Sequence, residues 1–249
     1  MKEKDKNILL NILDKYPKSR DNQSILVGFD GFIDYIIEVV DKRYSKDSFS
    51  SVDSIPEFSS KIKSASFKNT NIELYTKHKK IGGNSLILSN SLSELDVPVY
   101  IIGAMGEKNI HPIFNNLVDK CKNYYSISDP GETRALEFKD GKIMLGDLKA
   151  INKINYESIT RNISESKLVN ILKEVKIVSF LNWTMIIQMN KIIENFINLL
   201  EKNNINDKYL FFDLADFSKR TSKDIEKLFK ILKYRLKNYN VILGLNQKE

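Results

Sequence analysis

The chain has one cysteine, two histidines and no long apolar run among its 249 residues. A lone Cys121 excludes an intrachain disulfide, and we expect it to be an unreactive thiol in the core. His78 and His111 are too far apart for a local metal pair and have no cysteine nearby, which argues against zinc. No run of about 18 apolar residues predicts a membrane span, and the charged first residues lack the apolar segment of a secretory signal. We therefore expect a cytoplasmic protein without a membrane partner.

Lysine is abundant, and the formal net charge is +7 at pH 7. Such a charge raises the question of nucleic-acid binding. However, the lysines are scattered, and the sequence lacks the arginine-rich runs and the basic stripes with interleaved aromatic residues that single-strand binders use. We interpret the charge as a solvated surface that favours anionic small substrates such as nucleotides, and we predict no nucleic-acid partner.

The order of apolar segments predicts a single α/β domain over residues 1–249. The 42% of hydrophobic residues suffice for one sizeable core. An amphipathic helix is predicted at 5–16 and a buried strand at 24–29. From residue 167 onward helices alternate with strands, which favours a parallel sheet with right-handed crossovers. The predicted strands are 175–181, 209–213 and 241–245, and the predicted helices are 185–202 and 224–237.

Two further segments have a different pattern and predict a small β-sheet appended to this domain. Residues 36–44 are expected to run away from the main sheet, followed by a loop at 45–54, a short helix at 56–66 and an edge strand at 72–80. A hairpin is predicted from 133–138 and 142–146 around the turn pair Asp140-Gly141. We expect the segments 35–80 and 130–147 to form a lid that excludes water from a reaction site.

Polar side chains follow the predicted strands, where ligands bind in open α/β sheets. Each has a structural alternative: a turn at Asp30-Gly31, a cap or lysine partner for Asp34, helix caps for Asn182 and Thr184, and a turn for Asp216. The candidates are Asp30 and Asp34 after the first strand, Asn182 after 175–181, Asp213 and Asp216 after 209–212, and Asn246 with Glu249 after 241–245.

A glycine pair, Gly82-Gly83, precedes a predicted helix that begins near Asn84. Glycine lacks Cβ, so the backbone can approach a ligand closely, and the first N–H groups of a helix are unpaired. Such a helix end suits a sugar hydroxyl or a phosphate, although an ordinary strand-to-helix turn has the same sequence.

The longer stretch around this pair resembles a known signature. Gly82-Gly83-Asn84, a helix ending S-E-L-D and the segment V-P-V-Y-I-I-G-A-M-G-E resemble the first signature region of the PfkB/ribokinase superfamily of carbohydrate kinases. The family form is G-G-N-x-x-N followed by a strand ending G-x-x-G; Gly103 and Gly106 match, whereas Ile87 replaces the second Asn. Asn246 and Glu249 match the family's N-x-x-E motif.

The resemblance implies an α/β three-layer sandwich with a mostly parallel central sheet and a β lid, able to form a homodimer through the lid. It implies transfer of a terminal phosphoryl group from a nucleotide to a sugar or sugar-phosphate hydroxyl. ATP is the expected donor; G-F-D-G-F-I-D also resembles ADP-dependent relatives, which leaves ADP open. Asp34 is the better match for the sugar-gripping Asp, with Asp30 as the alternative. By resemblance Gly82, Gly83 and Asn84 would also contact substrate, and Asn246 and Glu249 would organise Mg²⁺ through water. Asn182 is a further candidate for substrate binding because it follows a predicted strand.

The family's later G-x-G-D motif, which supplies an anion hole and the catalytic base, does not occur in these 249 residues. We therefore expect the chain to be the N-terminal portion of a sugar kinase, with the base beyond residue 249 and negligible turnover by itself. The alternative is a non-catalytic sugar- or nucleotide-binding module that kept the fold.

Overall fold

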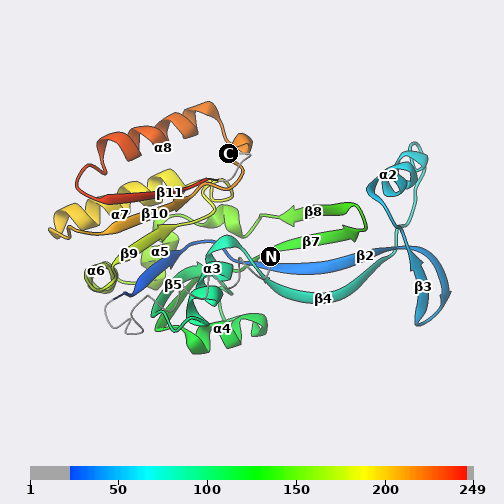
Figure 1. Cartoon of the computed structure of the whole chain (residues 1–249), viewed down its shortest axis with the longest axis horizontal. Helices are drawn as coiled ribbons and strands as arrows, with labels where there is room; N and C mark the ends of the chain where they lie inside the picture. The colour runs from blue at the N-terminus through cyan, green and yellow to red at the C-terminus, as the bar shows by residue number, and fades with distance from the viewer. Residues whose placement is uncertain (1–22, 246–249) are drawn as a thin grey trace, which may run out of the picture.

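The computed structural model describes residues 23–245, and its main element is a six-stranded sheet in the order β11-β10-β9-β1-β5-β6 (Figure 1). All five pairings within this sheet are parallel, which confirms the predicted parallel α/β arrangement. The strand at 209–213 has the predicted bounds, whereas β6 was not predicted. The strands are β1 (Ile25–Gly28), β5 (Val99–Ala104), β6 (Asn123–Ser128), β9 (Ile177–Phe180), β10 (Tyr209–Asp213) and β11 (Asn240–Gly244).

Helices cover both faces of the sheet, because its central strands are apolar on both sides. In β1, Leu26 packs into one buried cluster and its neighbour Val27 into the other. The first cluster includes side chains of α5 (Tyr156–Asn162), α6 (Glu165–Glu174), α7 (Met189–Lys202) and α8 (Ser222–Tyr234). The second includes side chains of α3 (Asn84–Ser93), α4 (Asn115–Lys120) and the short 3-10 helix η1 (Pro112–Phe114). The result is three layers, α/β/α.

Local capping explains where several helices begin. The side chain of Thr221 accepts a hydrogen bond from the Asp224 amide at the start of α8, and Ser164 does the same for Lys167 at the start of α6. The helix predicted from residue 185 begins only at Met189. Residues 183–188 form turns instead, since the Trp183 and Thr184 amides bond to carbonyls after β10 rather than within a helix.

A second, five-stranded sheet projects from this body (Figure 1). Its spine is β2 (Phe32–Ser45), which pairs antiparallel with β4 (Leu74–Gly82) and parallel with β7 (Gly131–Phe138). The hairpin partner of β7 is β8 (Gly141–Asp147), as the Asp140-Gly141 turn predicts. The predicted edge strand at 72–80 is β4, and the predicted helix at 56–66 is α2 (Ile55–Ser64).

One part of the second sheet differs from the sequence prediction. The predicted loop at 45–54 contains β3 (Ser48–Ser51), which turns back at Lys46-Asp47 and pairs with the far end of β2. An exposed edge strand needs no apolar alternation, so its serine-rich sequence did not indicate it. The nearby α2 packs on the sheet through a small cluster of Ile37, Val39, Val52, Phe58 and Leu136.

Several smaller expectations concern single residues. Cys121 follows α4 and is only partly buried, with its sulfur 3.5 Å from the Ser93 hydroxyl, so it is not a full core residue. Burial raises its pKa, which disfavours the reactive thiolate. His111 is the N-cap residue of η1, and His78 lies on β4. The helix predicted at 5–16 lies outside the described residues. Within residues 23–245, helices are too short or too polar to cross a membrane.

Candidate functional site

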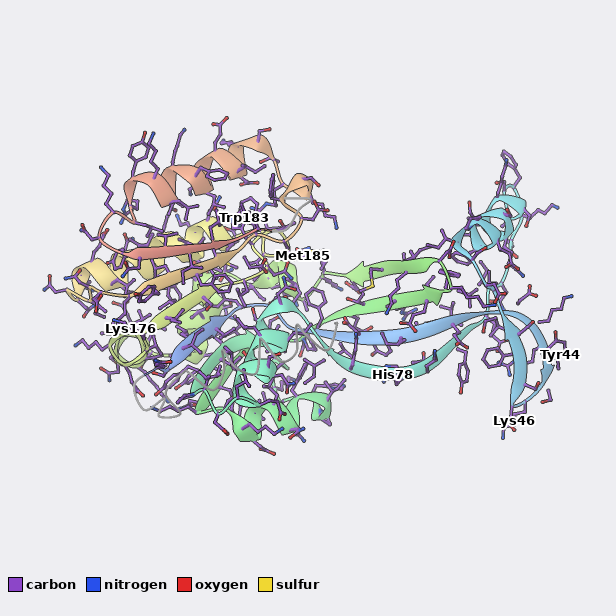
Figure 2. The ribbon with its side chains drawn as sticks, in the orientation of Figure 1. Tyr44, Lys46, His78, Lys176, Trp183 and Met185 are labelled. Carbon is purple, nitrogen blue, oxygen red and sulfur yellow. The ribbon has the colours of Figure 1, made fainter. Side chains whose placement is uncertain are left out.

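A cavity of about 530 Å³ lies where the carboxyl ends of the central strands meet the second sheet. Figure 2 shows Trp183 and Met185 on the side of the body that faces the second sheet, whereas Lys176 lies at the opposite side. This position is the usual ligand site of an open parallel sheet. The lining residues are Phe32, Asp34, Gly83, Asn84, Ile87, Thr133, Met144, Gly146, Leu148, Asn182, Met185 and Lys219.

Asp30 is fully buried and serves the start of α3. Its carboxylate accepts hydrogen bonds from the backbone amides of Asn84 and Ser85, at 3.0 and 2.8 Å, and from the Asn182 side chain at 2.7 Å. It caps a helix whose N-cap residue, Gly83, has no side chain to do so. Burial raises the pKa of Asp30, and the hydrogen bonds from Asn182, Ser85 and Asn84 oppose that shift. Asp30 therefore has a structural role as the cap of α3, and it does not line the cavity.

Asp34 has a different environment, although it lies only four residues further along the chain. It sits within β2 rather than in a loop, opposite Lys80 of β4 and Thr133 of β7, and its side chain lines the cavity. Burial raises the pKa of Asp34, while a hydrogen bond from the Thr133 side chain and the charge of Lys80 lower it. Because the backbone amides that engage Asp30 are not directed at Asp34, its carboxylate retains the capacity to accept hydrogen bonds from a ligand.

The glycine pair makes room for these two carboxylates. A Cβ on Gly82 would overlap the carboxylate of Asp34, and a Cβ on Gly83 would lie 2.9 Å from Asp30 Oδ2. Gly83 also has φ of +87°, which disfavours any residue with a side chain. Gly83 lines the cavity but Gly82 does not, so the pair allows close packing of acidic side chains as well as an approach to a ligand.

Asn84 and Asn182 join the helix start to the strand ends. The Asn84 side-chain amide donates a 2.6 Å hydrogen bond to Asp213 at the end of β10. Asn182 follows β9 with φ of +55° and is 6% exposed. Because its Nδ2 donates to the Asp30 carboxylate, its Oδ1 is the free acceptor, and that buried oxygen has no hydrogen-bond partner among the residues described. A ligand hydroxyl would satisfy it.

The remaining site residues predicted from the sequence are Asp216, Asn246 and Glu249. Asp216 does not line the cavity; its carboxylate accepts a 2.5 Å hydrogen bond from Ser218 in the 3-10 helix η3 (Phe217–Lys219), which supports its structural alternative. Asn246 and Glu249, the predicted magnesium pair, lie outside the described residues. Within residues 23–245, groups of three or more His, Cys, Asp or Glu side chains that could hold a metal ion are absent.

Sequence reasoning missed several cavity residues. Thr133 and Met144 reach the site only because β7 pairs in parallel with β2, which no local pattern predicts. Among the described residues, Lys219 is the cationic residue that lines the cavity. Its ammonium group lies 3.7 Å from the Asp216 carboxylate. Ile87, which replaces the family's second Asn, contributes an apolar side chain to the wall, 48% exposed.

The sequence model of a family described as "Prokaryotic ketohexokinase" matches residues 1–249. The chain belongs to the prokaryotic ketohexokinase family. A curated relative, ketohexokinase from Haloferax volcanii, is 23% identical over 172 residues, which cover 68% of this chain and 45% of that protein. The chain thus spans less than half the length of that ketohexokinase.

Solved carbohydrate kinases share the fold. A probable sugar kinase from Rhizobium etli CFN 42 has a TM-score of 0.53 at 10% identity, covering 86% of this chain and 62% of that one. A PfkB protein from Polaromonas sp. JS666 has a TM-score of 0.52 at 11% identity, covering 84% and 62%. A fructokinase from Xylella fastidiosa with bound ATP has a TM-score of 0.50 at 11% identity, covering 84% and 58%. Together with the ketohexokinase family match, these findings confirm the predicted ribokinase-like fold and the resemblance to PfkB/ribokinase carbohydrate kinases.

Proposed function

We propose that this protein is a cytoplasmic carbohydrate kinase that transfers the terminal phosphoryl group of a nucleotide to a hydroxyl of a ketohexose or ketohexose phosphate. The observation that carries the proposal is the position of Asp34. It is a carboxylate in the wall of a cavity of about 530 Å³, at the carboxyl ends of parallel strands, and its pKa is raised by burial. The family match supports a ketohexose over other sugars.

The cavity offers both kinds of contact that a sugar needs. Asp34 would accept hydrogen bonds from sugar hydroxyls, with the Asn182 Oδ1 as a second acceptor and Asn84 beside them. Phe32 and Met144 would pack against the C–H face of the ring. Lys219 would attract an anionic group, either a sugar phosphate or the phosphoryl group of the donor.

We propose that the second sheet acts as a lid over this cavity. Five residues of its strands line the cavity directly: Phe32, Asp34, Thr133, Met144 and Gly146. Closure of such an element excludes water and so suppresses hydrolysis of the nucleotide. Residues on β4 such as Leu74 and Tyr75 are exposed, 39% and 46%, and would suit pairing of two copies in a homodimer.

The proposed donor is ATP, with ADP as the alternative, and the proposed cofactor is Mg²⁺. Mg²⁺ keeps several waters and takes one or two carboxylates plus phosphate oxygens, so a Glu and an Asn such as Glu249 and Asn246 have suitable donor chemistry. When bound, the ion would neutralise phosphate charge. The residues described here would orient the sugar hydroxyl and exclude water, and we assign the catalytic base to none of them. Negligible turnover by this chain alone stays a prediction.

Calorimetric titration with fructose and with glucose, alongside an assay of sugar-dependent ADP release from ATP, tests the proposal. We expect fructose to bind better than glucose, and Asp34→Ala to weaken fructose binding by roughly 10- to 100-fold, the value of one or two hydrogen bonds to a charged group. Fructose affinity unchanged by Asp34→Ala would refute the assignment of Asp34. In the native full-length protein, sugar binding without phosphoryl transfer would favour the alternative, a non-catalytic binding module.

A further inference from the structure

The segment 182–188 contributes Asn182 and Met185 to the cavity, yet it has no regular secondary structure to hold it. Its first part is joined to the end of β10: the amides of Trp183 and Thr184 donate to the carbonyls of Asp213 and Leu214, each at 3.2 Å. The Thr184 hydroxyl also donates to Leu214 at 2.8 Å. Within the described residues, the carbonyls of Trp183 and Ile187 accept no backbone N–H and therefore need other partners, whereas the carbonyl of Ile186 accepts one from Met189.

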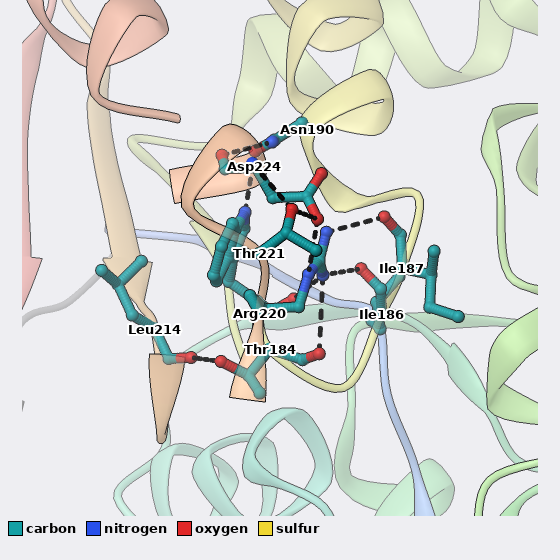
Figure 3. Close-up of polar contacts among 9 residues, drawn as sticks. Thr184, Ile186, Ile187, Asn190, Leu214, Arg220, Thr221 and Asp224 are labelled. Atoms are coloured by element: carbon teal, nitrogen blue, oxygen red, sulfur yellow. Dashed lines mark hydrogen bonds and ion pairs between the residues drawn. The ribbon is translucent and has the colours of Figure 1, made fainter. Parts of the chain in front are cut away.

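Arg220 supplies those partners (Figure 3). Its Nη1 donates to the carbonyls of Trp183 and Ile186, both at 3.1 Å, and its Nη2 donates to the carbonyl of Ile187 at 3.0 Å. Its guanidinium also stacks over the Trp183 ring, 4.4 Å from the centroid. One side chain, two residues before α8, therefore bonds to carbonyls near both ends of the segment.

Arg220 is itself held in place. Its side chain is 7% exposed, and its Nε lies 3.4 Å from Asp224 Oδ2, which also accepts a 2.8 Å hydrogen bond from the Thr221 hydroxyl. The Trp183 indole donates to Asn190, whose own amide donates to the Asp224 carbonyl at 2.9 Å. A planar guanidinium with several fixed donors can serve three carbonyls and a carboxylate together, which a lysine ammonium cannot reproduce.

We infer that Arg220 is a positioning residue for the sugar site: it fixes the segment 182–188 so that Asn182 and Met185 keep their places in the cavity wall. Asn182 in turn donates to Asp30 at the start of α3, so the wall forms one connected unit. The sugar-binding part of this inference rests on the proposed function. The fixing of the segment does not.

Amide hydrogen exchange and fructose titration of the full chain test the inference with three variants. In Arg220→Gln, exchange across 183–188 should become about tenfold faster, and the fructose Kd should rise about tenfold, the loss of one to two net hydrogen bonds. Arg220→Lys should behave nearly like Arg220→Gln, because it keeps the charge but not the fork. Arg235→Gln is the matched control and should change neither quantity, since among the described residues the Arg235 guanidinium bonds only to Asn198 and Glu201 of α7.

Three results would overturn the inference: unchanged exchange at 183–188, faster exchange that is equally large in β1 and β9, or a faster-exchanging segment with unchanged fructose affinity. Full retention of affinity in Arg220→Lys would show that charge alone suffices and would also contradict it. If the unmodified chain binds neither fructose nor glucose, the proposed function fails and the sugar-binding part of the inference fails with it. Exchange at 183–188 then still decides whether Arg220 fixes the segment.

Discussion

The two sheets of this protein differ in how much of their surface is buried. Every residue of β1 and β5 is buried, whereas in β4 only the last residue, Gly82, is buried. The body is thus stabilised by burial on both faces of its sheet, while the second sheet packs through one face on α2 and leaves β4 exposed. An element with less buried surface opens at lower free energy, which suits a lid.

The same contrast separates two carboxylates at the junction. The carboxylate of Asp30, in the body, already accepts hydrogen bonds from three N–H donors. Asp34 belongs to the second sheet, and its side chain lines the cavity. We conclude that a carboxylate near a strand end is a candidate ligand group only if the backbone has not already engaged it. Substitutions at this junction test whether the two carboxylates have these different roles.

The largest effect is expected for Asp30→Ala on stability. The substitution leaves the amides of Asn84 and Ser85 and the side chain of Asn182 without their buried acceptor. Part of the loss is offset because a desolvated carboxylate is removed as well. We expect the free energy of unfolding to fall by about 3 kcal/mol, measured by urea denaturation.

Asp34→Ala is the matched control for that experiment. Its side chain serves no helix cap, so its unfolding free energy should fall much less than that of Asp30→Ala. If the two variants are equally unstable, the division of the junction into a structural and a ligand-binding carboxylate is wrong.

A smaller effect, on binding, is expected for Gly82→Ala. The new Cβ would occupy the space of the Asp34 carboxylate and push it from its position in the cavity wall. We expect fructose affinity to fall about tenfold, as measured by calorimetric titration. Gly146→Ala is the control because Gly146 also lines the cavity, but a Cβ there would meet nothing within 4 Å. Equal losses in both variants would contradict the role given to Gly82.

The smallest effect at neutral pH is the pH dependence due to Asp34, whose pKa lies above its ordinary value of 3.8 because of burial. Sugar hydroxyls bond to the carboxylate, so fructose affinity should fall as pH decreases through this pKa, about twofold at the pKa and tenfold per unit below it. The free energy of unfolding depends on pH in the opposite direction. The folded state holds the Asp34 proton more tightly than the unfolded state, so this contribution is present below pH 3.8 and is lost as pH rises through the folded pKa.

Asp34→Asn provides the measurement for both signs. The amide does not titrate, so the pH dependence of fructose binding over that window should become flat, and the slope of unfolding free energy against pH should become less negative. A binding profile in Asp34→Asn with the same pH midpoint as the unmodified chain would assign the titration to another group.

Much of the body was predictable because its strands are apolar on both faces. Local pattern predicted the strand at 209–213 in the body and, in the second sheet, the hairpin around Asp140-Gly141. The segment from Gly82 to Gly106 indicated the family. The helix start at Met189 was not predictable, since the segment before it bonds to Arg220 and to the end of β10, which are distant in sequence.

Spacing along the chain was enough to predict the alternation of strands and helices from residue 175 onward, the role of the glycine pair at a helix start, and the family. Only the tertiary structure decided which acidic side chain faces the cavity. Asp30 and Asp34 both follow the first strand, and their roles differ because the amides of α3 reach one of them and not the other. The tertiary structure also placed Thr133 in the wall, since parallel pairing of β7 with β2 joins residues whose separation in sequence carries no signal.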